Sequence, residues 1–171
     1  MKKATMFALA LLAAPMAVEA QSASGTVGAS ATILAYLDVQ NVSDLDFGSI
    51  AAGSGATLTP GAVPGTGSLG VLQIDHNSEV IVSAVVPAFL TLAGAPNLPV
   101  TFDCGYSAAS SGALSGAAAA CNALPNQAGN GDGTTRTSYI QVGGDISAAN
   151  TAARIPGTYS GSLIFTVTAN Y

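Results

Sequence analysis

Apolar and polar residues alternate along the chain from Val27 to Val39. The apolar side chains occupy every second position of this run, at Val27, Ala29, Ala31, Ile33, Ala35, Leu37 and Val39. A period of two predicts a β-strand with one buried face. One straight strand of this length would span about 43 Å, longer than the strands of a typical sandwich. We therefore expect the run either to bend at Gly28 or to serve two different structural roles along its length.

The last residues of the chain alternate in the same way. Ser, Thr and Asn dominate one face of this segment, together with Ile164. The opposite face collects Gly161, Leu163, Phe165, Val167, Ala169 and Tyr171. This pattern predicts a final strand that packs one face on a core.

Short apolar segments separated by Gly, Pro, Asn and Asp fill the chain between these two ends. Turns are expected at 41–44, at 75–78 and at Gly143–Gly144. Strands are expected at 45–48, 57–59, 71–74, 80–86, 89–92, 100–104 and 139–142. About seven to nine short strands without a convincing helix indicate an all-β sandwich or barrel.

Residues 105–133 are of low complexity, with Ala, Ser, Gly and Asn dominating. We expect a loop there, with one helical turn near 117–124. Cys104 and Cys121 are the only cysteines, and in an oxidising compartment they predict one disulfide that closes this loop. Residues 21–171 are expected to form a single domain.

Residues 1–20 have the pattern of a cleaved signal peptide. Lys2 and Lys3 precede an apolar stretch, and Val18-Glu19-Ala20 provides the small residues of a cleavage site. We therefore expect an exported protein that resides in the periplasm, on the cell surface or outside the cell.

Charge excludes several classes of partner. Beyond residue 20 the chain has no lysine; two arginines and eight carboxylates remain, so the net charge becomes −6. Such a chain cannot form the basic surface that nucleic acids or anionic membranes require. No later apolar run approaches 18 residues, so no integral membrane span is expected.

The chain offers little catalytic chemistry. His76 is the only histidine, and its position in the segment 75–78 predicts a residue of a hairpin turn. A nucleophile elbow of the G-x-S-x-G type is absent. The segment 130–134 (NGDGT) resembles part of a calcium loop but lacks its regular positions and closing Glu, so we interpret it as a turn. We expect no enzyme, no cofactor and no metal site.

Three segments resemble a known family of bacterial proteins: 43–50 (SDLDFGSI), 143–146 (GGDI) and 156–171 (PGTYSGSLIFTVTANY). They are similar to the domain-of-unknown-function 4402 family, and the two end segments to the related spore coat protein U and pilin-like secreted proteins. The resemblance implies an immunoglobulin-like, pilin-like sandwich without enzymatic activity. It implies a fimbria-like subunit whose partners are identical or related subunits and a periplasmic chaperone and usher.

In such subunits a strand donated by a neighbour completes the sandwich. The resemblance therefore implies that residues 21–33, with Val27, Ala29, Ala31 and Ile33, form a donor segment. It also implies that the last strand borders the acceptor groove through Leu163, Phe165 and Val167, with Tyr171 at the end that a chaperone holds.

Other functions stay open at this point. The main alternative is a self-complete extracellular binding or adhesion module, for a carbohydrate or another surface ligand, that uses the loop near residues 129–135. A small outer-membrane β-barrel and a hydrolase are more distant alternatives. The main expectation is a secreted structural surface subunit.

Overall fold

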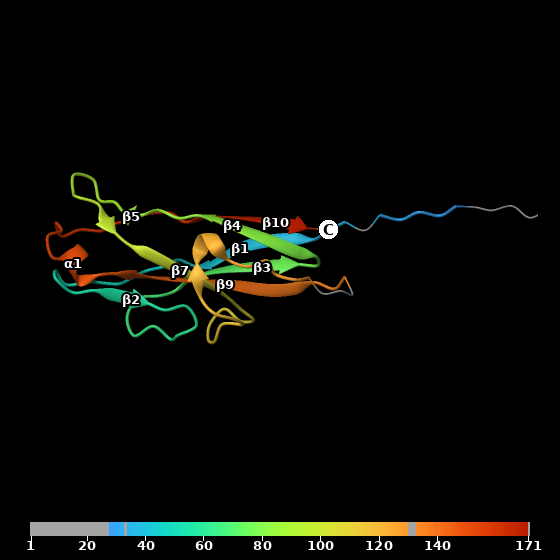
Figure 1. Ribbon diagram of the computed structural model, residues 1–171, viewed down its shortest axis with the longest axis horizontal. Coiled ribbons are helices and arrows are strands. Elements are labelled where there is room, and N and C mark those ends of the chain that lie inside the picture. Colours follow the sequence, from blue (N-terminus) through green and yellow to red (C-terminus); the bar gives the residue numbers. More distant parts are fainter. Residues whose placement is uncertain (1–27, 33, 130–132, 171) are drawn as a thin grey trace, which may run out of the picture. The chain divides into compact units, whose positions relative to one another are not determined.

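The structure is a computed structural model that describes residues 28–32, 34–129 and 133–170 (Figure 1). The chain divides into two compact units, Met1–Thr32 and Ile33–Tyr171. In the first unit, the described residues are exposed and form no strand or helix. The second unit contains every strand found in the described residues.

One large antiparallel sheet forms the first layer of the second unit. Its strands follow the order β1-β3-β9-β7-β8, and β2 also pairs with β9. The long strand β9 is therefore central, with β3 and β2 along one edge and β7 along the other. The bounds are β1 Leu37–Ser43, β2 Ala56–Leu58, β3 Gly70–His76, β7 Thr101–Ser107, β8 Ala119–Ala120 and β9 Arg136–Ile146.

A narrower layer covers part of this sheet (Figure 1). It consists of the antiparallel pair β4 (Glu79–Val85) and β10 (Ile164–Asn170). A small hairpin and two short helical turns complete the described part: β5 Phe89–Leu90, β6 Leu98–Pro99, the 3₁₀ turn η1 Cys121–Ala123 and α1 Ala148–Thr151. The fold is an all-β sandwich, as the alternating patterns predict.

The core lies between the two layers. Ile74 and Ile140 of the large sheet and Val80 of β4 are fully buried. Each such side chain contributes roughly 1.5–3 kcal/mol to the free energy of folding. Two strands cannot cover a sheet of six, however, and β10 is the strand of the narrower layer that lies near β1.

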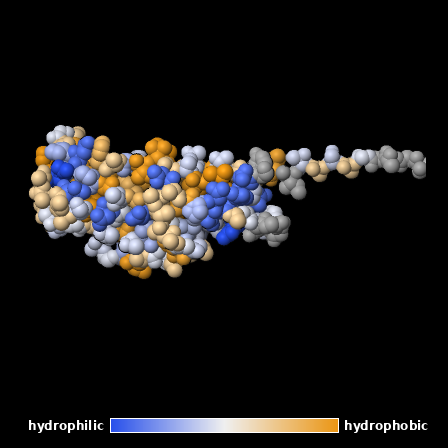
Figure 2. Space-filling view, viewed as in Figure 1, coloured by the Kyte–Doolittle hydropathy of each residue, from blue (hydrophilic) through white to orange (hydrophobic). Residues whose placement is uncertain are grey.

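The outer face of the β4–β10 pair carries exposed apolar side chains. Figure 2 shows apolar side chains along the upper surface, where Figure 1 places β4 and β10. The exposed ones on these two strands are Ile81, Val85 and Ile164. Val85 and Ile164 are directly paired across the strands.

Several predicted strands are confirmed. The expected strands at 71–74 and 80–86 correspond to β3 and β4, and the weak strand at 57–59 corresponds to β2. β10 has the predicted alternation, with half-buried Phe165 and Val167 between exposed neighbours. Here the period-two pattern reports directly which face packs on the core.

The predicted long first strand is wrong for the described residues. β1 begins at Leu37, and residues 28–32 and 34–36 lie outside any strand. The predicted turn at 41–44 is also wrong, because β1 continues to Ser43 with an irregularity between Asn41 and Ser43. Pairing with β3 holds this polar stretch in extended form, although its residues favour turns.

Gly143 and Gly144 lie inside β9 and form no turn, so that prediction is wrong as well. A Cβ atom on Gly143 would overlap the carbonyl oxygen of Leu58, and one on Gly144 would overlap that of Thr101. The glycines therefore allow β2 and β7 to approach the central strand closely. The sequence pattern alone cannot distinguish such a close approach from a turn.

The disulfide between Cys104 and Cys121 is present, with sulfur atoms 1.98 Å apart. It joins β7 to η1, and both cysteines are buried. The expected helical turn near 117–124 is found as η1. The bond thus holds one end of the low-complexity loop against the core.

Tyr106 on β7 gives a prediction about alkaline stability. Its hydroxyl is buried without a hydrogen-bond partner in the described part of the chain, and burial raises the pKa of Tyr106 to about 12. Above pH 10 the unfolded chain loses this proton while the folded chain keeps it, so rising pH favours unfolding. We expect Tyr106→Phe to preserve or raise stability at pH 8, by up to about 1 kcal/mol. Urea unfolding should show its advantage over the wild type widening from pH 10 to pH 12; a constant difference would contradict this.

Candidate functional site

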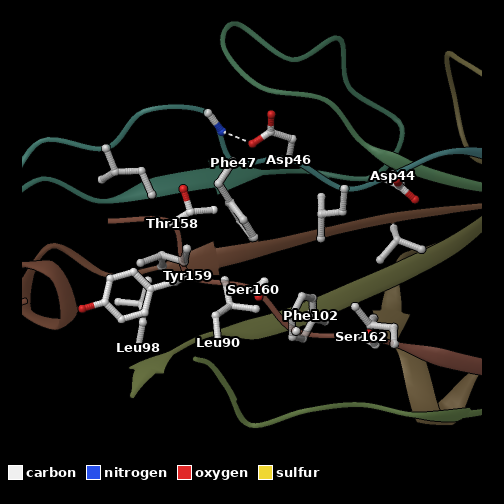
Figure 3. Close-up of a pocket in the computed structure, with 18 of the residues that line it drawn as sticks. Asp44, Asp46, Phe47, Leu90, Leu98, Phe102, Thr158, Tyr159, Ser160 and Ser162 are labelled. Carbon is white, nitrogen blue, oxygen red and sulfur yellow. Dashed lines mark hydrogen bonds between the residues drawn. The ribbon is translucent and has the colours of Figure 1, made fainter. Parts of the chain in front are cut away.

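A groove of about 1210 Å³ opens along the incompletely covered side of the sandwich (Figure 3). One wall comes from β1 and the segment 44–50 that follows it. The other wall comes from residues 154–163 and the start of β10. These walls lie more than 100 positions apart in the sequence, and the two layers of the sandwich bring them together.

Apolar core residues form the floor of the groove, and polar residues contribute about equally to its lining. Figure 3 shows Phe47 pointing from the 44–50 wall toward Leu98, Leu90 and Phe102. Five apolar side chains of the lining are at most 6% exposed: Val71, Leu98, Phe102, Val142 and Ile146. The groove therefore reaches the hydrophobic core directly.

The walls add half-buried side chains that pack against this core. Leu45 and Ile50 belong to the first wall, and Tyr159, Leu163 and Phe165 to the second. Val39 of β1 also lines the groove and remains 39% exposed.

The backbone along the groove has unpaired strand edges. β10 pairs with β4 along its full length, and β1 pairs with β3. Within the described ranges, no backbone pairing joins β1 to β10 or adds a strand to either free edge. Such edges present free N–H and C=O groups that can pair with another strand.

Ten polar side chains also line the groove. Asp46 accepts a hydrogen bond from the backbone N–H of Gly48 at 2.8 Å, and Asp44 accepts one from Asn41 Nδ2 at 2.8 Å. Arg154 lines the same groove, and its Nε is buried without a hydrogen-bond partner among the described residues. The patterns along the sequence did not single out Arg154, because it lies in a loop without periodicity.

The structure places the predicted assembly residues as follows. Leu163 and Phe165 line the groove, and Val167 is half-buried farther along β10. Ala29 and Ala31 are exposed. Outside the described residues lie the predicted signal peptide 1–20 and the side chains Val27, Ile33 and Tyr171.

His76 is not a turn residue, contrary to the prediction. It is the last residue of β3 and is fully buried. Its Nδ1–H donates to the carbonyl oxygen of Ser78 at 2.7 Å, because a carbonyl oxygen can only accept, and its Nε2 lies 3.2 Å from Ser138 Oγ. Both ring nitrogens are thus used in structural hydrogen bonds away from the groove.

Metal and membrane features can be assessed only where the chain is described. Within those ranges, no group of three or more His, Cys, Asp or Glu side chains could hold a metal ion. Residues 130–132 of the calcium-like segment, which also belong to the loop of the binding-module alternative, lie outside them. No helix in the described ranges is long and apolar enough to cross a membrane.

Comparison with protein families gives one match, to the family DUF4402, a domain of unknown function, over residues 37–171. The chain belongs to the DUF4402 family. The DUF4402 region starts at the first residue of β1, so residues 1–36 precede it. No curated protein and no solved structure matches the chain. The relation to spore coat protein U stays a prediction.

Proposed function

We propose that this DUF4402 protein is an exported structural subunit of a fimbria-like surface assembly. In this proposal, the N-terminal segment of one copy enters the groove of the next copy as an additional strand. The observation that carries it is the apolar groove between β1 and β10, bordered by two unpaired strand edges.

A β-strand suits this groove better than a small ligand does. The free edges of β1 and β10 can form backbone hydrogen bonds with an extended segment, and alternate side chains of that segment can reach the apolar floor. The groove also follows the walls of the sandwich and includes both Val39 and Phe165. A strand would therefore complete the narrower layer of the sandwich.

The N-terminal segment of a second copy fits this role in size. Residues 27–33 match the seven residues of β10 in length, about 23 Å when extended. Phe47, Phe102 and Phe165 line the groove, and in the proposed complex the inward side chains Ala29 and Ala31 pack against this lining. Both alanines are exposed and lie outside the sandwich unit, as a segment awaiting a partner should be.

Other features support export and a structural role. The signal-peptide pattern and the buried disulfide agree with an oxidising compartment. Before assembly, a periplasmic chaperone would cover the groove, because an exposed apolar edge promotes aggregation. We propose no catalytic role and no cofactor.

A synthetic peptide provides the test. The exported protein is expected to self-associate, and excess peptide with the sequence of residues 24–36 should fill the grooves and shorten the assemblies. Sedimentation velocity measures the size distribution. A peptide of the same composition in scrambled order is the control. A protein that sediments as a monomer, and whose sedimentation does not change when the peptide is added, would contradict strand donation. Such a result would favour the self-complete binding module.

A further inference from the structure

Arg154 is one of only two basic side chains beyond residue 20 of the chain. It follows α1 closely, and its backbone N–H bonds to the carbonyl oxygen of Thr151 at 3.2 Å. Its side chain lines the groove at the wall formed by residues 154–163. The other arginine, Arg136, is exposed at the start of β9 and does not line the groove.

The guanidinium of Arg154 lacks an acceptor in the described part of the chain. Its Nε is buried without a hydrogen-bond partner among the described residues, although the residue as a whole is only half-buried. The carboxylates Asp44 and Asp46 border the same groove, but each accepts hydrogen bonds from its own segment. A buried N–H donor without an acceptor is unfavourable, so the Nε of Arg154 favours a ligand that supplies an acceptor.

We propose that Arg154 anchors one end of the inserted strand by donating hydrogen bonds to main-chain carbonyl oxygens there. The inference rests on the proposed function. Residues 21–33 contain no Asp or Glu, so the donor segment offers carbonyl, hydroxyl and amide oxygens as acceptors and no carboxylate. The planar fork of an arginine can donate to two such oxygens at once.

An arginine at this place strengthens binding at one end of the strand, in addition to what the apolar floor supplies. When a strand slides by two residues, the same face still points inward, and the main-chain carbonyl oxygens recur with the same period. Hydrogen bonds from Arg154 to these oxygens therefore add affinity at that end and do not select one register. The apolar floor supplies most of the affinity, and Arg154 anchors one end of the strand.

The test measures binding of a fluorescent peptide with the sequence of residues 24–36, by anisotropy. The recipient is the exported full chain carrying Ala29→Asp and Ala31→Asp, so that its groove stays empty. Arg154→Gln should weaken binding roughly tenfold through faster dissociation. Arg154→Lys should recover part of the loss, and the melting temperature should not change. Arg136→Gln, which removes a hydrogen bond to the carbonyl oxygen of Ala128, is the matched control and should bind like its parent.

Two shortened peptides test the end-specific contact. Peptides of residues 24–33 and 27–36 each lack one end, and the effect of Arg154→Gln should disappear with one of them only. Equal binding by the Arg154→Gln chain and its parent would overturn the role of Arg154 and leave strand donation intact. Absence of peptide binding by the parent itself would overturn the proposed function, and with it this inference.

Discussion

Replacing Ala29 and Ala31 with aspartate is expected to convert the assembled protein into monomers. In the proposed complex both side chains point toward the apolar floor formed by Phe102 and Val142. Burying an unpaired carboxylate there costs several kcal/mol. At about 3 kcal/mol each, the two changes would weaken association by about 10⁴-fold. Size-exclusion chromatography with light scattering measures the loss.

The control uses the opposite face of the same segment. Ser30→Asp with Thr32→Asp adds the same charge at positions that point away from the floor in an inserted strand. This variant should retain assembly, apart from a small salt-dependent repulsion. Loss of assembly in both variants would point to general charge repulsion, and loss in neither would contradict insertion of this segment.

Removing the disulfide by Cys104→Ala with Cys121→Ala is expected to destabilise the fold strongly. The bond spans a sequence separation of 17 residues, for which the chain-entropy treatment gives about 3 kcal/mol. Both cysteines are also buried in the core, so the loss of sulfur atoms adds a cavity term. A decrease of about 10 °C in Tm is expected for a domain of this size.

Calorimetry or thermal circular dichroism measures this change. Ser110→Ala with Ser111→Ala alters two exposed residues of the same loop and should leave Tm unchanged. Since neither cysteine lines the groove, the disulfide variant should still assemble below its melting temperature. A Tm equal to that of the wild type would show that the low-complexity loop is already restricted in the unfolded chain.

The failed predictions share a physical cause. Asn41 and Gly143 belong to residue types that favour turns, and His76 lies between such residues, yet all three lie in strands. Pairing with β3 extends the polar end of β1, and the close approach of β2 and β7 requires glycines in β9. Local preferences of a few tenths to about 1 kcal/mol are overridden by such tertiary pairing.

The sequence by itself determined the class of fold, the buried face of β10 and the pairing of Cys104 with Cys121, because each depends on local periodicity or on residue count. The tertiary structure decided that the sandwich is open between β1 and β10. Alternation tells which face of a strand is buried, but it contains no information about which edge lacks a neighbour. The groove and the unpartnered Arg154 depend on walls from distant segments, and only the packing of the two layers brings them together.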